Sequence, residues 1–162
     1  KKILVTCSGA TYPPRYGTVG ILVRKIKNFE KFRFSIHSCI VSVENEIINI
    51  YREYQKIVES LPRKIYLKEN SKVCWDSRFL IESSSKAFYC HVMNDKLWLK
   101  LKGKFESLKK QRNIKFELIK TLPIIQINKK FIISYLSSNS DLIENSIKIM
   151  FNPKIPLTKK NF

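Results

Sequence analysis

The chain has 162 residues, with 31 Lys and Arg against 13 Asp and Glu, which gives a formal charge of +18 at pH 7. Hydrophobic residues make up 44% of the chain, so the composition excludes a disordered basic tail and supports a folded core. The four glycines are never adjacent, which excludes a glycine-rich phosphate loop, and no apolar run is long enough to span a membrane.

The positive charge is distributed unevenly along the chain. Residues 61–162 carry 21 basic and eight acidic residues, a net charge of +13, whereas residues 1–60 carry a net charge of +5. An A+T-rich genome raises the frequency of lysine, isoleucine and asparagine together, because their codons are rich in A and T. It would also raise the frequency of glutamate, which is not abundant here. The excess therefore indicates a polyanionic partner.

The first 28 residues predict two helices joined by an extended linker. Residues 1–8 are typical of the end of a helix, which Gly9 terminates. Two prolines keep residues 12–15 extended. Residues 16–28 place apolar side chains at helical spacing. Because the chain starts with Lys within such a helix, we expect it to be a fragment of a longer protein.

A β-hairpin is predicted next, with strands at residues 32–43 and 47–51 and a turn at residues 44–46. Its candidate core positions are Ile36, Val41, Val43, Ile48 and Ile50.

Residues 54–62 predict a short helical connector that ends at Pro62, which we take as a domain boundary. We expect one unit at residues 1–60, formed by a helical linker and the hairpin, and a basic α+β unit at residues 61–162.

The second unit predicts short strands around one longer helix. Strands are expected at residues 64–67, 78–82, 87–93, 124–127, 131–135 and 146–151, with Ser83–Ser85 as the turn between the second and third. A helix is expected over residues 95–111, with Asp95 as its N-cap. The predicted fold class is therefore α+β, with an N-terminal helical segment and β-hairpin followed by a small, mainly antiparallel sheet domain with one or two helices.

The helix over residues 95–111 carries the densest positive charge. Residues 96–120 hold nine basic and two acidic side chains, and Lys96, Lys100 and Lys104 fall on the side opposite the apolar stripe. A purely solubilising face is the alternative to a phosphate-binding one.

No catalytic or metal-binding motif is visible in the sequence. His37 and Cys39 on one predicted strand and Cys90 and His91 on another offer a weak zinc-site alternative, because structural zinc ligands usually come as Cys/His pairs two to four residues apart. No histidine lies beside a nucleophile motif. The four cysteines form no CxxC pair and read as free thiols. We therefore predict no catalytic residue, no metal and no cofactor in this chain.

Three short clusters remain: Tyr12–Arg15, Tyr51–Glu53 and Trp75–Phe79. Each has a structural interpretation, since Asp76 and Arg78 can pair locally, Arg52 can pair with Glu53 or another neighbour, and Trp75 can fill the core. For Arg52, Trp75, Asp76 and Arg78 we keep open both a structural role and a role in binding the polyanionic partner.

Taken in order, these clusters resemble the C-terminal region of tRNA(Ile)-lysidine synthetase in its compact alphaproteobacterial or organellar form. The family's P-P-R elbow is residues 13–15, its T-L-x-G-C strand is residues 35–39, its R-E pair is residues 52–53 and its W-D-x-R-F block is residues 75–79. Leu122–Pro123 and the terminal segment 151–162 complete the order. This chain departs from the family pattern at Ser35, Ile36 and Ser38, where the family has threonine, leucine and glycine.

The resemblance implies a function and its partners. The whole enzyme uses ATP with magnesium to join lysine to the wobble cytidine of the isoleucine tRNA with a CAU anticodon. The family's S-G-G-x-D-S loop for ATP lies in an N-terminal catalytic domain and has no counterpart here, so this chain alone is expected to be inactive. Its role would be to bind the tRNA, in the cytoplasm or an organelle matrix, with no membrane. The resemblance leaves open whether the chain forms a homodimer.

We predict that tRNA contacts come from exposed basic residues, namely Arg15, Arg24, Lys100, Lys104, Lys109, Lys110 and Arg112. The alternative functions are a free-standing RNA-binding or ribosome-associated module without catalysis, and a peripheral protein on anionic membranes.

Overall fold

The computed structural model describes residues 1–28, 31–112, 115–133 and 146–158, and for residues 104–112 it gives the helical backbone without the side chains. Its helices and antiparallel sheets confirm the predicted α+β class. None of the described helices is both long and apolar enough to cross a membrane.

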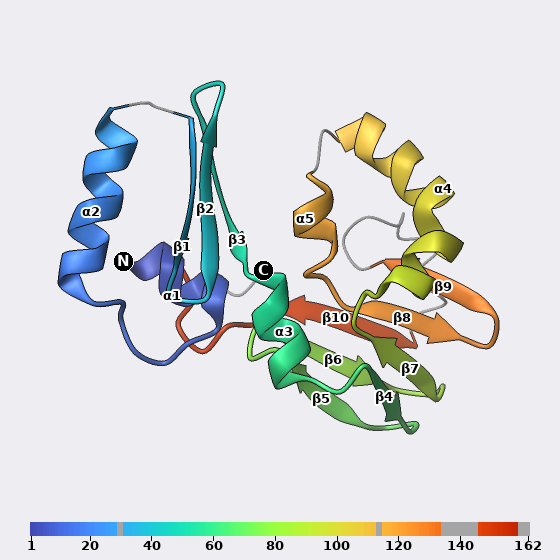
Figure 1. The fold of residues 1–162 in the computed structure, drawn as a ribbon. Coiled ribbons are helices and arrows are strands. Elements are labelled where there is room, and N and C mark those ends of the chain that lie inside the picture. Colours follow the sequence, from blue (N-terminus) through green and yellow to red (C-terminus); the bar gives the residue numbers. More distant parts are fainter. Residues whose placement is uncertain (29–30, 113–114, 134–145, 159–162) are drawn as a thin grey trace.

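The N-terminal part builds two helices against a three-stranded sheet (Figure 1). The helices are α1 (Lys2–Ser8) and α2 (Tyr16–Lys27), and the strands pair in the order β1 (Phe32–Ile36), β2 (Cys39–Glu44) and β3 (Ile47–Arg52). The apolar sides of the helices close a small core against the sheet, formed by Leu4, Leu22, Ile36, Cys39 and Val41.

The predicted long strand over residues 32–43 is wrong, because it is two strands joined by a tight turn at His37–Ser38. Both turn residues have left-handed backbone, with φ of 52° and 57°. The turn brings Ile36 opposite Cys39 and converts the expected hairpin into a three-stranded meander. Of the expected core positions, Ile36, Val41 and Val43 are buried, but Ile48 is 45% exposed.

After the short helix α3 (Tyr54–Ser60), the chain forms two further sheets. Strands β5 (Lys72–Trp75), β6 (Phe79–Ser83) and β10 (Ile147–Phe151) pair in the order β10-β6-β5. Strands β4 (Lys64–Leu67), β7 (Phe88–His91), β8 (Ile124–Ile127) and β9 (Lys130–Ile133) pair in the order β4-β7-β8-β9.

The expected hairpin between β6 and β7 is therefore wrong. Residues Ser83–Ser85 do not form a hairpin turn, because they carry the chain from one sheet to the other. The partners of β6 are β5 and β10. Strand β5 is not predicted from the sequence because it has only two apolar core-facing positions, Val73 and Trp75.

Helices α4 (Asp95–Arg112) and α5 (Phe116–Ile119) lie over the four-stranded sheet that contains β7 and β8 (Figure 1). The N-cap of α4 is Asn94 rather than the expected Asp95, since Asn94 Oδ1 accepts a hydrogen bond of 2.9 Å from the Leu97 amide. Leu97 and Leu101 are buried in the larger core, together with Trp75, Phe88 and residues of β8 and β9.

The proposed division after residue 60 stays a prediction. Ile57 of α3 packs in the larger core, so the connector helix belongs by its packing to the C-terminal part.

Candidate functional site

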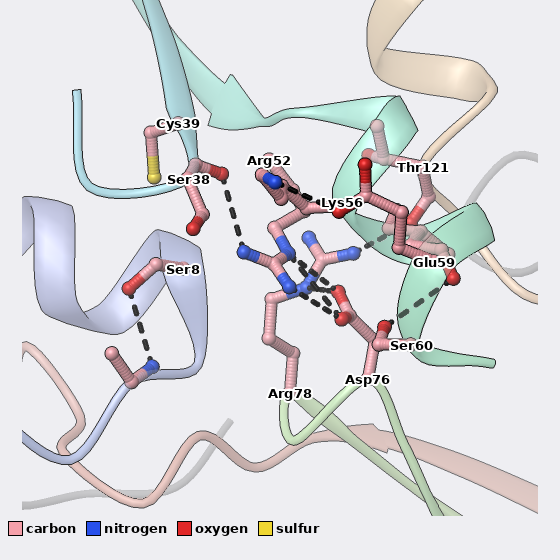
Figure 2. Close-up of polar contacts among 12 residues, drawn as sticks. Ser8, Ser38, Cys39, Arg52, Lys56, Glu59, Ser60, Asp76, Arg78 and Thr121 are labelled. Atoms are coloured by element: carbon pink, nitrogen blue, oxygen red, sulfur yellow. Dashed lines mark hydrogen bonds and ion pairs between the residues drawn. The ribbon is translucent and has the colours of Figure 1, made fainter. Parts of the chain in front are cut away.

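A buried arginine–aspartate centre lies where the two parts of the chain meet (Figure 2). Asp76 accepts hydrogen bonds from Arg52 Nε and Nη2 at 3.0–3.3 Å and from Arg78 Nε at 2.7 Å. The exposed fractions are 9% for Arg52, 6% for Asp76 and 4% for Arg78. Figure 2 shows both guanidinium groups beside one another above the Asp76 carboxylate.

Three local features place these side chains. Arg52 ends β3, and its Nη1 donates to the Ser38 carbonyl in the turn between β1 and β2 at 3.3 Å. Asp76 and Ser77 make the turn between β5 and β6 with left-handed φ of 48° and 54°. Arg78 precedes β6 and donates to the Thr121 carbonyl at 2.8 Å, next to Leu122.

Gly9 lets helix α1 approach this turn. It has φ of 70°, and a Cβ atom added there would lie 2.8 Å from the Asp76 carbonyl oxygen and 3.0 Å from Arg78 Cγ. Only glycine fits both the backbone conformation and the space.

The C-terminal segment that follows β10 packs against both α1 and the residues around Arg78. The Asn152 amide donates to the Arg78 carbonyl at 2.7 Å, and Thr6 Oγ1 donates to the Ile155 carbonyl at the same distance. The Phe151 ring packs edge-on against Phe79. Arg52, the Trp75–Phe79 block, Thr121–Leu122 and the segment after Phe151 therefore meet in one place, although they are far apart in the chain.

Positive charge exceeds negative charge in this centre. Within the described parts of the chain, Asp76 is the one carboxylate that pairs with either arginine. Burial lowers the pKa of Arg78, and the adjacent Asp76 carboxylate opposes that shift. Burial also raises the pKa of the neighbouring Cys39 thiol to about 12, so this thiol is neutral and supplies no counter-charge.

A polar cleft of about 390 Å³ opens beside the centre. Its lining brings together the end of α1, the turn at His37–Ser38, Arg52, the turn at Asp76–Ser77 and Lys154 from the C-terminal segment. The His37 ring meets the Tyr12 ring edge-on, and its Nε2 is shielded from solvent without a hydrogen-bond partner among the described residues. Burial lowers the pKa of His37, and the positive charge of Arg52 adds to this effect.

The structure places the predicted tRNA-contact residues in two separate regions. Arg15, the N-cap residue of α2, and Arg24 on α2 are exposed, while Lys100 is exposed on α4. Lys104, Lys109, Lys110 and Arg112 belong to α4, but their side chains lie outside the described residues. Figure 1 shows α2 and α4 at opposite sides of the molecule, so these residues form no single compact patch.

The four residues for which the sequence left both a structural and a binding role open lie inside the molecule. Arg52, Asp76 and Arg78 form the centre, and Trp75 is 1% exposed. Arg52 pairs with Asp76 rather than with Glu53, whose carboxylate instead accepts a hydrogen bond from Ser35 Oγ.

Sequence reasoning missed the cleft residues His37, Ser38 and Lys154. It also missed an exposed aromatic pair, Tyr66 on β4 and Tyr89 on β7, whose rings lie 5.0 Å apart with Lys64 Nζ 3.5 Å above Tyr89. The available signal was Lys64 and Tyr66 at alternate positions of a strand. The cleft had no comparable signal because its residues come from six separate segments, including Ser60 and Leu61 at the end of α3.

The described residues contain no group of three or more His, Cys, Asp or Glu side chains that could hold a metal ion. His37 does not lie on a strand beside Cys39, as the zinc alternative required, because it forms the turn. His91 Nε2 is instead hydrogen-bonded to Gln126 at 2.8 Å.

No family model matches the chain, and no solved structure matches it. Curated relatives do match, and their names place them among enzymes of tRNA modification. They are tRNA(Ile)-lysidine synthases: the protein of Rickettsia prowazekii is 29% identical over 141 residues, and that of Rickettsia rickettsii (strain Sheila Smith) is 32% identical over 141 residues. The protein of Rickettsia felis is 32% identical over 139 residues.

Each match covers 80% of this chain but only 27–30% of the relative, so the chain spans less than a third of these proteins' length. The relatives confirm the resemblance to the lysidine synthase family that the ordered motifs predicted.

Proposed function

We propose that this chain is the C-terminal, tRNA-binding portion of a tRNA(Ile)-lysidine synthase. The observation that carries the proposal is the similarity to lysidine synthases over 80% of the chain. The chain also carries a formal charge of +18, and a double-stranded RNA partner is recognised largely through its backbone and shape. By the same resemblance, ATP and magnesium are bound by the catalytic domain, and this portion supplies affinity for the isoleucine tRNA.

Helix α4 is the first candidate for phosphate contacts. Leu97 and Leu101 face the core, whereas Lys96, Lys100 and Lys102 are exposed. Lysines on the free side of an anchored helix reach phosphates without a change in the fold. The exposed Arg15 at the N-cap of α2 and the exposed Arg24 on α2 are a second contact region, which a long partner such as tRNA can reach at the same time.

The direct test is binding of the chain to the isoleucine tRNA with a CAU anticodon over a salt series. If about six phosphates are engaged, the plot of log affinity against log salt should have a slope of about −4 to −5. A flat salt response would contradict the proposal. If the chain binds heparin and every tRNA with equal affinity, the claim that it recognises tRNA specifically is contradicted. That result would favour a basic module that binds polyanions nonspecifically.

A charge-reversal pair tests the contribution of α4. Lys96→Glu with Lys100→Glu should weaken tRNA binding and reduce the magnitude of the salt slope by about two, one for each lost contact. The matched control is Lys129→Glu with Lys130→Glu in the turn and first residue of β9, where both side chains are also exposed. An equal loss in both pairs would mean that net charge, rather than the α4 face, determines affinity.

A further inference from the structure

The cleft beside the arginine–aspartate centre carries features of an anion site. Arg52 borders it directly, and Lys154 lines it from the C-terminal segment. Asp76 also borders the cleft, but its two carboxylate oxygens are already occupied by the two arginines at 2.7–3.3 Å. The carboxylate therefore neutralises only part of the positive charge at the base of the cleft.

The charge balance of the centre lacks one anion. Two guanidinium groups share one carboxylate, and all three side chains are at most 10% exposed. A buried charge without a partner is unfavourable because it has lost its hydration. The carbonyl oxygens of Ser38 and Thr121 offset part of this cost through hydrogen bonds, but they carry no full charge. A ligand anion in the cleft would supply the missing negative charge.

The remaining groups at the cleft suit a phosphate. The hydroxyls of Ser38 and Ser77 and the ammonium group of Lys154 are donors at its rim, and the His37 side chain lines it. A volume of about 390 Å³ holds a phosphate together with part of its ribose.

We propose that this cleft binds a phosphate group of the RNA, between Lys154, the turn at His37–Ser38 and Arg52. This inference rests on the proposed tRNA-binding function and names a contact that lies away from α4. Arg52 supplies the positive charge at the base of the cleft, whereas Lys154, being exposed and outside the buried centre, contacts the ligand from the rim.

The first experiment uses inorganic phosphate and the whole ¹⁵N-labelled chain, with chloride added to keep ionic strength constant. The amides of Ser38 and of residues 8–11 should shift and saturate. The shift should be lost in Lys154→Ala and His37→Asn, and asparagine is chosen because it tolerates the left-handed turn conformation. The matched control, Lys148→Ala on β10, removes an exposed lysine from the preceding strand and should leave the shift intact. If the phosphate-induced amide shift persists in Lys154→Ala, or if lysines across the surface shift equally, the proposed phosphate site is contradicted.

The second experiment measures tRNA affinity for the same variants. Lys154→Ala should weaken binding about tenfold, the loss expected for a charge-assisted contact, and should reduce the magnitude of the salt slope by about one. The tRNA should displace inorganic phosphate from the cleft, whereas ATP at the same phosphate concentration should not. Displacement by ATP alone would assign the cleft to a free nucleotide and overturn the RNA assignment.

The two proposals fail in different ways. If wild type and Lys154→Ala bind tRNA equally, the cleft is not an RNA contact, but the tRNA-binding function stands. If no variant or wild-type chain binds tRNA while inorganic phosphate still saturates the cleft, the anion site stands and the proposed function is wrong.

Discussion

Asp76 links residues that are distant in the sequence. It pairs with Arg78 two positions away and with Arg52 from the preceding part of the chain, and all three side chains are nearly buried. In such a cluster the removal of one partner costs more than the net stability of the intact cluster, because the remaining charges stay buried without compensation.

Asp76→Asn should therefore destabilise the chain strongly, by about 3–5 kcal/mol, since it leaves two buried guanidinium groups without an anion. Urea unfolding measures this change. The control is Glu59→Gln, which removes an exposed ion pair with Lys56 and should have little measurable effect. A loss from Asp76→Asn no larger than that of the control would show that the centre contributes little to the fold.

Gly9 sets the distance between α1 and the turn at Asp76–Ser77. Gly9→Ala should destabilise by about 2–4 kcal/mol, because the new Cβ enters a left-handed conformation and lies 2.8 Å from the Asp76 carbonyl oxygen. Gly20→Ala is the matched control, since Gly20 lies within α2 with nothing near its added Cβ. It should stabilise by about 0.5–1 kcal/mol. Thermal unfolding of both variants gives the two signs, and equal signs would contradict this account of Gly9.

At the scale of elements, the sheets depend on tight turns built without glycine. His37–Ser38, Asn45–Glu46 and Asp76–Ser77 all have positive φ at both positions. Two-residue hairpin turns require this conformation, and asparagine or glycine adopts it most readily. The sequence predicts the turn at residues 44–46, which contains Asn45, whereas the turn at His37–Ser38 carries neither asparagine nor glycine and is not predicted.

Glu46→Gly should stabilise the hairpin between β2 and β3 by about 1 kcal/mol, because glycine removes the strain of a left-handed glutamate. Glu46→Ala is the control: it makes the same change of charge but keeps the strain. A rise in thermal midpoint for glycine without one for alanine is expected. Equal rises would attribute the gain to charge and refute the role of backbone strain.

At the scale of the whole molecule, the formal charge of +18 acts on stability and on binding in opposite directions. Repulsion between exposed lysines and arginines destabilises the compact state, and salt screens it. The same salt weakens attraction to a polyanion.

Raising sodium chloride from about 0.05 M to about 0.5 M should therefore raise the thermal midpoint while it lowers tRNA affinity. Scanning calorimetry and binding assays at matched salt check the two signs. Lys129→Glu with Lys130→Glu lowers the net charge and should reduce the salt dependence of the midpoint. A midpoint that falls with salt would show that surface attraction between ion pairs, such as Lys72 with Glu82, outweighs the repulsion.

The sequence by itself determined the α+β class, the helices α1, α2, α3 and α4, most strands and the family resemblance. These features depend on local patterns: apolar periodicity, a terminating glycine, prolines and the order of short motifs. These signals are local because the apolar residues that form the buried face of a helix or strand lie within one short stretch of sequence.

Only the tertiary structure decided which strands pair and why the motifs occur together. Pairing of β6 with β5 and β10 rather than with β7 depends on where the rest of the chain packs, and serines at the end of β6 cannot reveal it. The same holds for the centre. Arg52, Asp76 and Arg78 each had a local alternative, and only three-dimensional proximity excludes the pairing of Arg52 with Glu53. The cleft is formed by six segments at once. Long-range electrostatics and shape, unlike periodicity, leave no pattern in a single stretch of residues.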